Sequence, residues 1–143
     1  VIGSSMEGTL VDGDCVYAIR SSSPRRGDIV IIDTDEKPII KRVIALGGDT
    51  VELKAGVLYL NGEQVDEPYV DPVNNTASYS KNTFSVITVP EGKMFFMGDN
   101  RDDSNDSRSK YGVMPVSSIM GIVADWSLSC KGAVTTFNNL FSF

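Results

Sequence analysis

The chain has 143 residues, of which 41% are hydrophobic and 22% charged, and its 19 acidic and 13 basic side chains give a net charge of −6. This length is enough for one domain with a hydrophobic core, and an acidic balance without a Lys/Arg-rich run argues against nucleic acid as a partner. The sequence contains no histidine, which excludes Ser-His-Asp and Cys-His catalysis and the commonest ligands of catalytic zinc. Hydrolytic chemistry would then need carboxylates, a thiol, or a nucleophile served by lysine.

Short strands separated by turn residues are predicted along most of the chain, because segments rich in Val, Ile, Phe or Tyr alternate with Gly, Pro, Asp or Asn. Asn61-Gly62 predicts a two-residue hairpin, since a type I′ turn needs positive φ at both central residues. Helical character is expected only near Pro115–Ile119 and in the tail from Ala133. The expected strands are Asp14–Arg20, Asp28–Asp33, Pro38–Leu46, Thr50–Leu53, Val57–Leu60, Phe84–Val89, Met94–Met97 and Gly121–Trp126.

This pattern indicates a mainly β fold in one domain. We expect residues 1–50 and 94–143 to form its core and residues 51–93, approximately, to form a small inserted lobe. The polar stretch from Asp66 to Ser80, with two prolines and an Asn pair, predicts an excursion on the surface. Cys15 and Cys130 match no metal-ligand spacing; we expect buried thiols, with a disulfide as the alternative in an oxidising compartment.

Two adjacent cations, Lys41 and Arg42, interrupt the apolar strand Pro38–Leu46. Alternation gives each face of this strand one cation among apolar side chains. If the strand is buried on both faces, Arg42 must find a carboxylate, whereas burial lowers the pKa of Lys41 and lets it act, uncharged, as a general base. The alternative is an edge strand from which both cations reach solvent.

Two polar segments are further candidates for chemistry. The segment from Gly3 to Leu10 holds two serines beside glycines, which is typical of a plain loop as well as of a nucleophile in a tight turn. The segment from Gly98 to Arg108 has eleven residues and no apolar side chain. It departs from an EF-hand calcium loop at the glycine and final glutamate positions. It is therefore either a surface loop or a buried network of carboxylates and arginines.

In this order the segments resemble the type I signal peptidases, Ser-Lys proteases that remove signal peptides from exported proteins. The resemblance covers most of the chain and implies a signal-peptidase/LexA-like fold of coiled antiparallel β-sheet. The run from Gly98 to Arg108 is similar to the family signature Gly-Asp-Asn-Arg…Ser-x-Asp-Ser-Arg. The other matching motifs are Ser4-Ser5-Met6-Glu7-Gly8-Thr9-Leu10, Arg26-Gly27-Asp28-Ile29-Val30, and Lys41-Arg42-Val43-Ile44 with Gly48-Asp49.

The resemblance implies that Ser5 is the nucleophile, that Lys41 is the general base and that Ser104 orients the lysine amine. It also implies a supporting scaffold and a shallow apolar site for small P1 and P3 side chains, beside which the peptide adds itself to the sheet. The supporting residues are Asp106, Arg108, Asp99, Arg101 and Arg42. The substrate-binding residues are Met6, Leu10, Ile39 and Ile40.

The partners implied by the resemblance are the signal peptides of secreted preproteins and a membrane lipid surface; neither a cofactor nor a metal is implied. The expected location is the outer face of the bacterial cytoplasmic membrane, with an N-terminal transmembrane anchor that is absent from this chain and would precede Val1. The apolar tail is expected to contact lipid or the core; its residues are Phe137, Leu140, Phe141 and Phe143.

The chain departs from the family pattern at two glycines. Gly8 stands where the family usually has proline, which leaves the turn freer in the unfolded chain. Gly3 stands where some members have a hydroxyl that stabilises the oxyanion, so the Ser5 N–H would be the chief donor. Two alternative functions stay open: a catalytically weak or inactive relative acting as a chaperone or assembly factor for surface proteins, and a LexA/UmuD-like self-cleaving protein.

Overall fold

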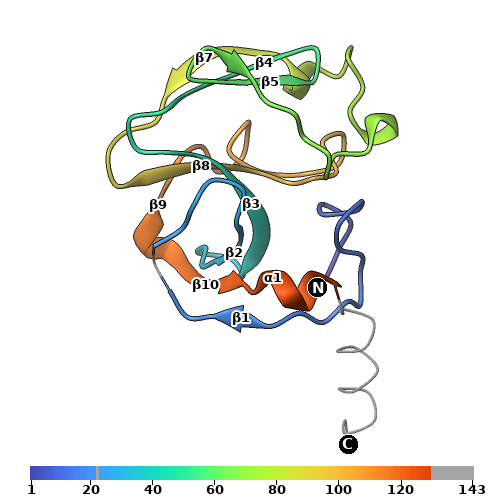
Figure 1. Cartoon of the computed structure of the whole chain (residues 1–143), viewed down its shortest axis with the longest axis vertical. Coiled ribbons are helices and arrows are strands. Elements are labelled where there is room, and N and C mark those ends of the chain that lie inside the picture. Colours follow the sequence, from blue (N-terminus) through green and yellow to red (C-terminus); the bar gives the residue numbers. More distant parts are fainter. Residues whose placement is uncertain (22, 130–143) are drawn as a thin grey trace, which may run out of the picture.

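The computed structural model describes residues 1–21 and 23–129, which form two antiparallel sheets (Figure 1). The larger sheet has the strand order β1-β10-β2-β3-β8-β9. Its strands are β1 (Ala18–Ile19), β2 (Ile29–Ile32), β3 (Ile39–Leu46), β8 (Lys93–Met97), β9 (Met114–Pro115) and β10 (Ile119–Val123). The expected mainly β fold is confirmed.

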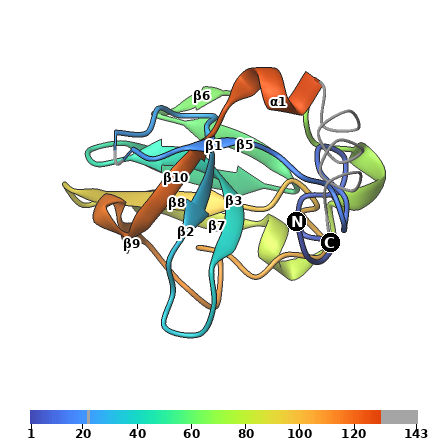
Figure 2. The same cartoon turned by 90° about the horizontal axis from the view of Figure 1, so that it is seen from below.

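The smaller sheet has the order β6-β5-β4-β7 and lies beyond β8 at the top of Figure 1. Its strands are β4 (Thr50–Lys54), β5 (Val57–Leu60), β6 (Glu63–Gln64) and β7 (Phe84–Thr88). Short helices lie between or after the strands: three single 3-10 turns, Pro72–Asn74, Ser80–Asn82 and Val116–Ser118, and the helix α1 (Asp125–Ser129), seen from below in Figure 2.

The hairpin predicted at Asn61-Gly62 is confirmed. These two residues have φ values of 53° and 84°, the left-handed values that a type I′ turn requires. The turn joins β5 to β6 in antiparallel register, with Leu60 opposite Glu63. Asn and Gly are the residues that adopt this conformation at low cost, so the local sequence determines the turn.

Two of the expected strands differ from the structure. The segment Asp14–Arg20 is strand only at Ala18–Ile19, because its first residue is bonded elsewhere: the Asp14 carbonyl accepts a hydrogen bond of 2.8 Å from the Val1 amine. The last expected strand ends at Val123, and α1 begins at Asp125 instead. An acidic residue in the first turn favours a helix start through its interaction with the helix dipole.

Both sheets contribute to one hydrophobic core. β3 and β8 of the larger sheet pack against β4 and β5 of the smaller one. The division into a core and an inserted lobe stays a prediction, because the two sheets share these side chains. The buried members are Ile44, Ala45, Val51, Leu53, Leu58, Val89, Phe95 and Met97.

Two further findings concern the ends of the chain. Within residues 1–21 and 23–129, no helix has the length and apolar character needed to cross a membrane. Cys15 is half-buried, less than expected for a core thiol. Its predicted alternative partner, Cys130, and the apolar tail from Ala133 lie outside the described residues.

Candidate active site

The strand that carries Lys41 is an interior strand, so the edge-strand alternative is wrong. β3 pairs with β2 on one side, where Val30 lies opposite Lys41, and with β8 on the other, where Met97 lies opposite Arg42. The two cations are 5% and 8% exposed. Both must therefore be accommodated inside the protein.

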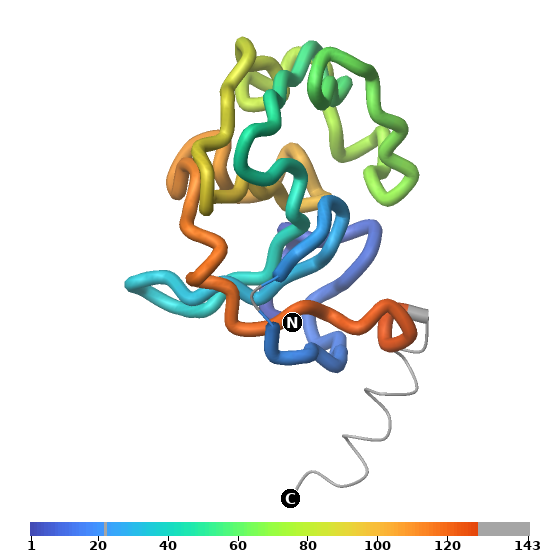
Figure 3. The backbone as a smooth tube through the Cα atoms, turned by 60° about the vertical axis from the view of Figure 1, so that its left-hand side comes forward, coloured from blue at the N-terminus to red at the C-terminus, as the bar shows by residue number. Residues whose placement is uncertain are grey.

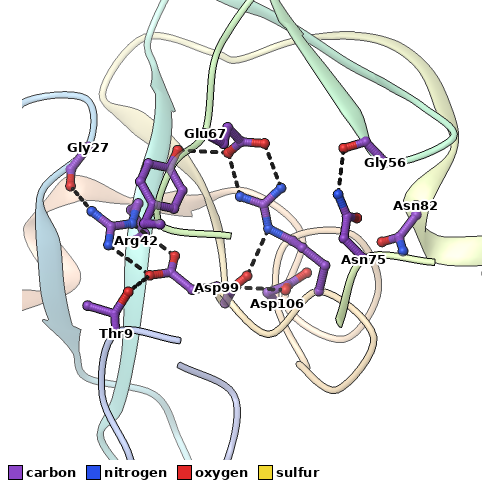
Figure 4. A network of polar contacts seen from close by, with 12 residues as sticks. Thr9, Gly27, Arg42, Gly56, Glu67, Asn75, Asn82, Asp99 and Asp106 are labelled. Atoms are coloured by element: carbon purple, nitrogen blue, oxygen red, sulfur yellow. Dashed lines mark hydrogen bonds and ion pairs between the residues drawn. The ribbon is translucent and has the colours of Figure 1, made fainter. Parts of the chain in front are cut away.

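Arg42 reaches a carboxylate, as its burial requires. Its guanidinium makes a bidentate ion pair with Asp99, with hydrogen bonds of 2.9 and 2.7 Å, and donates a third bond of 2.8 Å to the Gly27 carbonyl (Figure 4). The Thr9 hydroxyl donates to the same carboxylate at 2.6 Å. Asp99 thus joins the strand after Lys41 to the segment after Ser5.

Lys41 is treated differently, since no hydrogen bond to its amine occurs among the described residues. Burial, the largest influence, lowers its pKa to about 8, against the opposing effect of the Asp106 carboxylate. At the ordinary pKa about one lysine in 2,500 is neutral at pH 7, whereas at a pKa of about 8 the fraction is about one in ten. The environment therefore provides an appreciable population of uncharged amine.

The Ser5 backbone is held in a tight turn against the polar segment Gly98 to Arg108. The Asn100 N–H donates to the Ser5 carbonyl at 2.9 Å, and the Asn100 side chain donates to the Ser4 carbonyl at 3.1 Å. A helical turn then follows, in which the Leu10 N–H bonds the Met6 carbonyl at 2.8 Å. Figure 3 shows this N-terminal segment in blue, below the green excursion.

Gly98 is the point at which the candidate residues converge. A Cβ at this position would lie 2.5 Å from the Ser5 carbonyl oxygen and would collide with Ser104 Oγ. The antiparallel register that pairs Arg42 with Met97 puts Gly98 opposite Lys41, one residue further along. A glycine is therefore required here, because any side chain would push the serine segment away from the lysine strand.

Beside this point lies a buried ion pair of Asp106 and Arg108. The guanidinium bonds the carboxylate at 2.9 and 3.0 Å, and the Gly98 N–H donates to it at 3.1 Å. Burial opposes ionisation of Asp106, but the bonds and charge of Arg108 outweigh it and keep the pKa of the carboxyl below its usual value. The pair contributes a carboxylate and a guanidinium to the surroundings of Lys41.

Ser104 is buried in the same cluster, at 7% exposure. Its hydroxyl lies near the Asp106 carboxylate and favours the ionised form of that group. The geometry nevertheless falls short of a hydrogen bond, so that Ser104 Oγ is an unpaired buried atom among the described residues. A buried hydroxyl without a partner is unusual in a folded protein, and it is available to a neighbouring amine.

The structure shows that the segment Gly98 to Arg108 is a buried network and not a surface loop. Its buried polar residues are Asp99, Asn100, Arg101, Ser104, Asp106 and Ser107. Arg101 is fully buried, and its partner lies outside the segment: it makes a bidentate ion pair with Glu67, with bonds of 2.9 and 2.6 Å.

Sequence reasoning missed Glu67, because it lies in the excursion expected to be on the surface. The Tyr69 ring in the same excursion lies 3.8 Å from the Arg42 guanidinium, and its hydroxyl donates to Glu67 at 2.7 Å (Figure 4). The one available signal was that a buried arginine needs a carboxylate. That rule does not tell which acid of the chain supplies it.

The expected substrate-binding residues are placed on two faces of β3. Met6 and Leu10 are fully buried in a cluster to which Ile40 adds a partly buried side chain. Ile39 instead packs on a second cluster with Val30 and Phe96. The stretch Ile39–Lys41 extends past the last residue of β3 that pairs with β8, so one of its backbone edges is left open for an extended peptide.

The fold and this cluster define a class: a mainly β protein with a buried, unpaired lysine amine set beside a serine-bearing turn. The model of a known family, "Signal peptidase, peptidase S26", matches residues 1–126. The chain belongs to this signal peptidase family. Its function is that of signal peptidase I, a serine endopeptidase that acts on the signal peptides of preproteins.

Individual relatives agree with this assignment. The chain is 42% identical to a signal peptidase I of Bacillus licheniformis, over 85% of the chain and 70% of the relative. It is 37% identical to signal peptidase I S of Bacillus subtilis, over 78% and 71%. A crystal structure of a signal peptidase I from Enterococcus faecalis matches with a TM-score of 0.60 and 32% identity, over 71% of the chain and 97% of that structure.

Proposed function

We propose that the peptidase reaction uses Ser5 as nucleophile and Lys41 as general base. The observation that carries this proposal is a lysine amine on an interior strand, buried and without a hydrogen bond, whose pKa is lowered to about 8. The convergence of Ser5, Ser104 and the lysine strand on Gly98 supports it further. In a chain without histidine, this amine replaces the imidazole of other serine proteases.

The proposed reaction has two halves. Neutral Lys41 takes the proton from Ser5 Oγ as that oxygen attacks the scissile carbonyl, and the ammonium then protonates the leaving amine. In the second half, a water deprotonated by Lys41 hydrolyses the acyl-enzyme. The Ser104 hydroxyl would orient the amine, and Asp106, Arg108, Asp99, Arg101 and Arg42 would hold the segments in register.

The oxyanion would rest chiefly on the Ser5 backbone N–H. The Gly3 N–H is a weak candidate for a second donor, since it donates to the Asp12 carboxylate at 2.8 Å. The peptide would lie extended along Ile39–Ile40, with small P1 and P3 side chains near Met6, Leu10 and Ile40. These apolar residues leave little free volume, which fits a preference for small side chains.

The test is cleavage of a peptide with an Ala-x-Ala site by the wild type, Ser5→Ala and Lys41→Arg. We expect kcat/KM to fall at least about a thousandfold in both variants, because arginine keeps the charge but cannot act as a base. In the wild type, kcat/KM should rise with pH through about 8, as Lys41 loses its proton. Substantial cleavage by either variant would overturn the dyad and favour the chaperone alternative.

We also propose that the protein works against a lipid surface, at the outer face of the bacterial cytoplasmic membrane. The support is the position of two exposed apolar side chains beside the nucleophile turn: Ile2 is 92% exposed and Val11 is 48% exposed. Their segments run side by side, because the Gly13 N–H bonds the Val1 carbonyl at 2.8 Å. Exposed apolar groups near a catalytic turn suit contact with lipid.

A further inference from the structure

Ser4, the neighbour of the proposed nucleophile, makes a side-chain contact that the dyad does not use. Its hydroxyl donates a hydrogen bond to the Asp103 carboxylate, 99 residues along the chain. Together with the two bonds from Asn100, this contact ties the nucleophile turn to the polar segment at three points. A bond to a carboxylate is stronger than one between neutral groups.

The turn depends on such anchors because its backbone is permissive on both sides. Gly3 and Gly8 flank the serines with φ values of 92° and 104°, which glycine adopts more readily than other residues. The Ser5 hydroxyl itself makes no hydrogen bond with another described residue. Its direction is therefore set by the backbone around it, and Ser4 is the residue whose side chain holds that backbone.

Asp103 also acts on the proposed base. Lys41 is influenced by burial, by the carboxylates of Asp106 and Asp103, which favour the ammonium form, and by the cations Arg108 and Lys37, which disfavour it. Asp106 is already paired with Arg108. Asp103 forms no ion pair within the described part of the chain, and its printed bond is the one to Ser4.

We propose that the Ser4–Asp103 hydrogen bond is a positioning device for the peptidase reaction: it fixes the turn so that the Ser5 hydroxyl keeps its direction toward Lys41. This inference rests on the proposed dyad. Ser4 is a positioning residue, since it acts through its neighbour and touches no reacting atom. Asp103 adds a second effect, because a carboxylate near the amine stabilises the ammonium formed when Lys41 takes the serine proton.

The test compares Ser4→Ala, Ser4→Thr, Asp103→Asn and the double variant Ser4→Ala/Asp103→Asn. In Ser4→Ala, kcat should fall about three- to tenfold with KM nearly unchanged, while the pH profile keeps its position. Ser4→Thr, which retains a hydroxyl, should recover most of the loss. Ser85→Ala and Glu63→Gln, exposed positions in the smaller sheet, should behave as the wild type.

Asp103→Asn should show a different signature. Besides a fall in kcat, the acidic limb of kcat/KM should move to lower pH, because removal of a carboxylate lowers the pKa of Lys41 further. The double variant should lose little more kcat than the worse single variant, since both remove the same bond.

Three results would overturn the inference: wild-type kcat in Ser4→Ala, additive losses in the double variant, or an unmoved acidic limb in Asp103→Asn. These are distinct from failure of the dyad. If Ser5→Ala and Lys41→Arg are inactive while Ser4→Ala matches the wild type, the positioning role is wrong and the dyad stands. If Ser5→Ala is active, both are wrong.

Discussion

Lys41 is held in a state that opposes folding and favours catalysis. An amine in water keeps its proton near pH 10.5, and the interior of the sheet lowers its pKa to about 8. Between these values the unfolded chain binds more protons at this group than the folded protein does, so the free energy of unfolding increases with pH over that window. Below about pH 8 the full cost of burying the charge is present.

Lys41→Met should remove this cost, because methionine fills a similar volume without a charge. We expect the variant to be inactive and more stable at pH 7, by at most about 3 kcal/mol, with no gain in stability between pH 8 and 10.5 from this site. Urea unfolding at a series of pH values measures both effects. Lys54→Met, at an exposed lysine, is the control. A Lys41→Met protein less stable than the wild type at pH 7 would contradict the burial argument.

At the scale of elements, the nucleophile turn has a conformation of its own at Gly8. Its φ of 104° lies in the region that favours glycine, and the Tyr69 carbonyl oxygen would be 3.3 Å from an added Cβ. Proline, which the family usually has here, fixes φ near −65°. The glycine is thus required by this backbone, and greater freedom of the turn is not its only consequence.

Gly8→Pro should therefore reduce both activity and stability, although it brings the sequence closer to the family. The turn between Ser5 and Thr9 would have to rearrange, at a cost of about 1–3 kcal/mol, and kcat/KM should fall with it. Gly8→Ala, strained but not locked, should lie between the two. The measurements are thermal unfolding and cleavage of the same Ala-x-Ala peptide; a Gly8→Pro enzyme as stable and active as the wild type would refute this reading of the turn.

Strands and turns specified by neighbouring residues were predictable, and contacts across the chain were less so. β3 and the Asn61-Gly62 turn follow from local pattern, since a run of apolar residues and a positive-φ pair each have one good local solution. The burial of Lys41 depended on which strands flank β3, which no local signal reveals. Glu67 was missed for the same reason, as its partner Arg101 lies 34 residues away.

At the scale of the molecule, the nucleophile turn lies between two surfaces of different character. On one side the polar segment and the smaller sheet provide ion pairs such as Arg101–Glu67. On the other, the neighbouring segments around Ile2 and Val11 expose apolar side chains. Substrates whose cleavage sites follow an apolar signal segment would approach from the lipid side, so this asymmetry orients the enzyme toward its substrate.

The orientation is testable with Ile2→Ser/Val11→Ser, which removes apolar area at exposed positions without touching the core. We expect weaker binding to vesicles of anionic and zwitterionic lipid, and a loss of the stimulation of cleavage by lipid, because each exposed aliphatic side chain contributes about 1.5–3 kcal/mol when fully buried. Activity on a short peptide in buffer should change little. Val86→Ser, at a 58% exposed position on β7, is the matched control, since it lies on the smaller sheet. Equal vesicle binding by both variants and the wild type would place the lipid contact elsewhere.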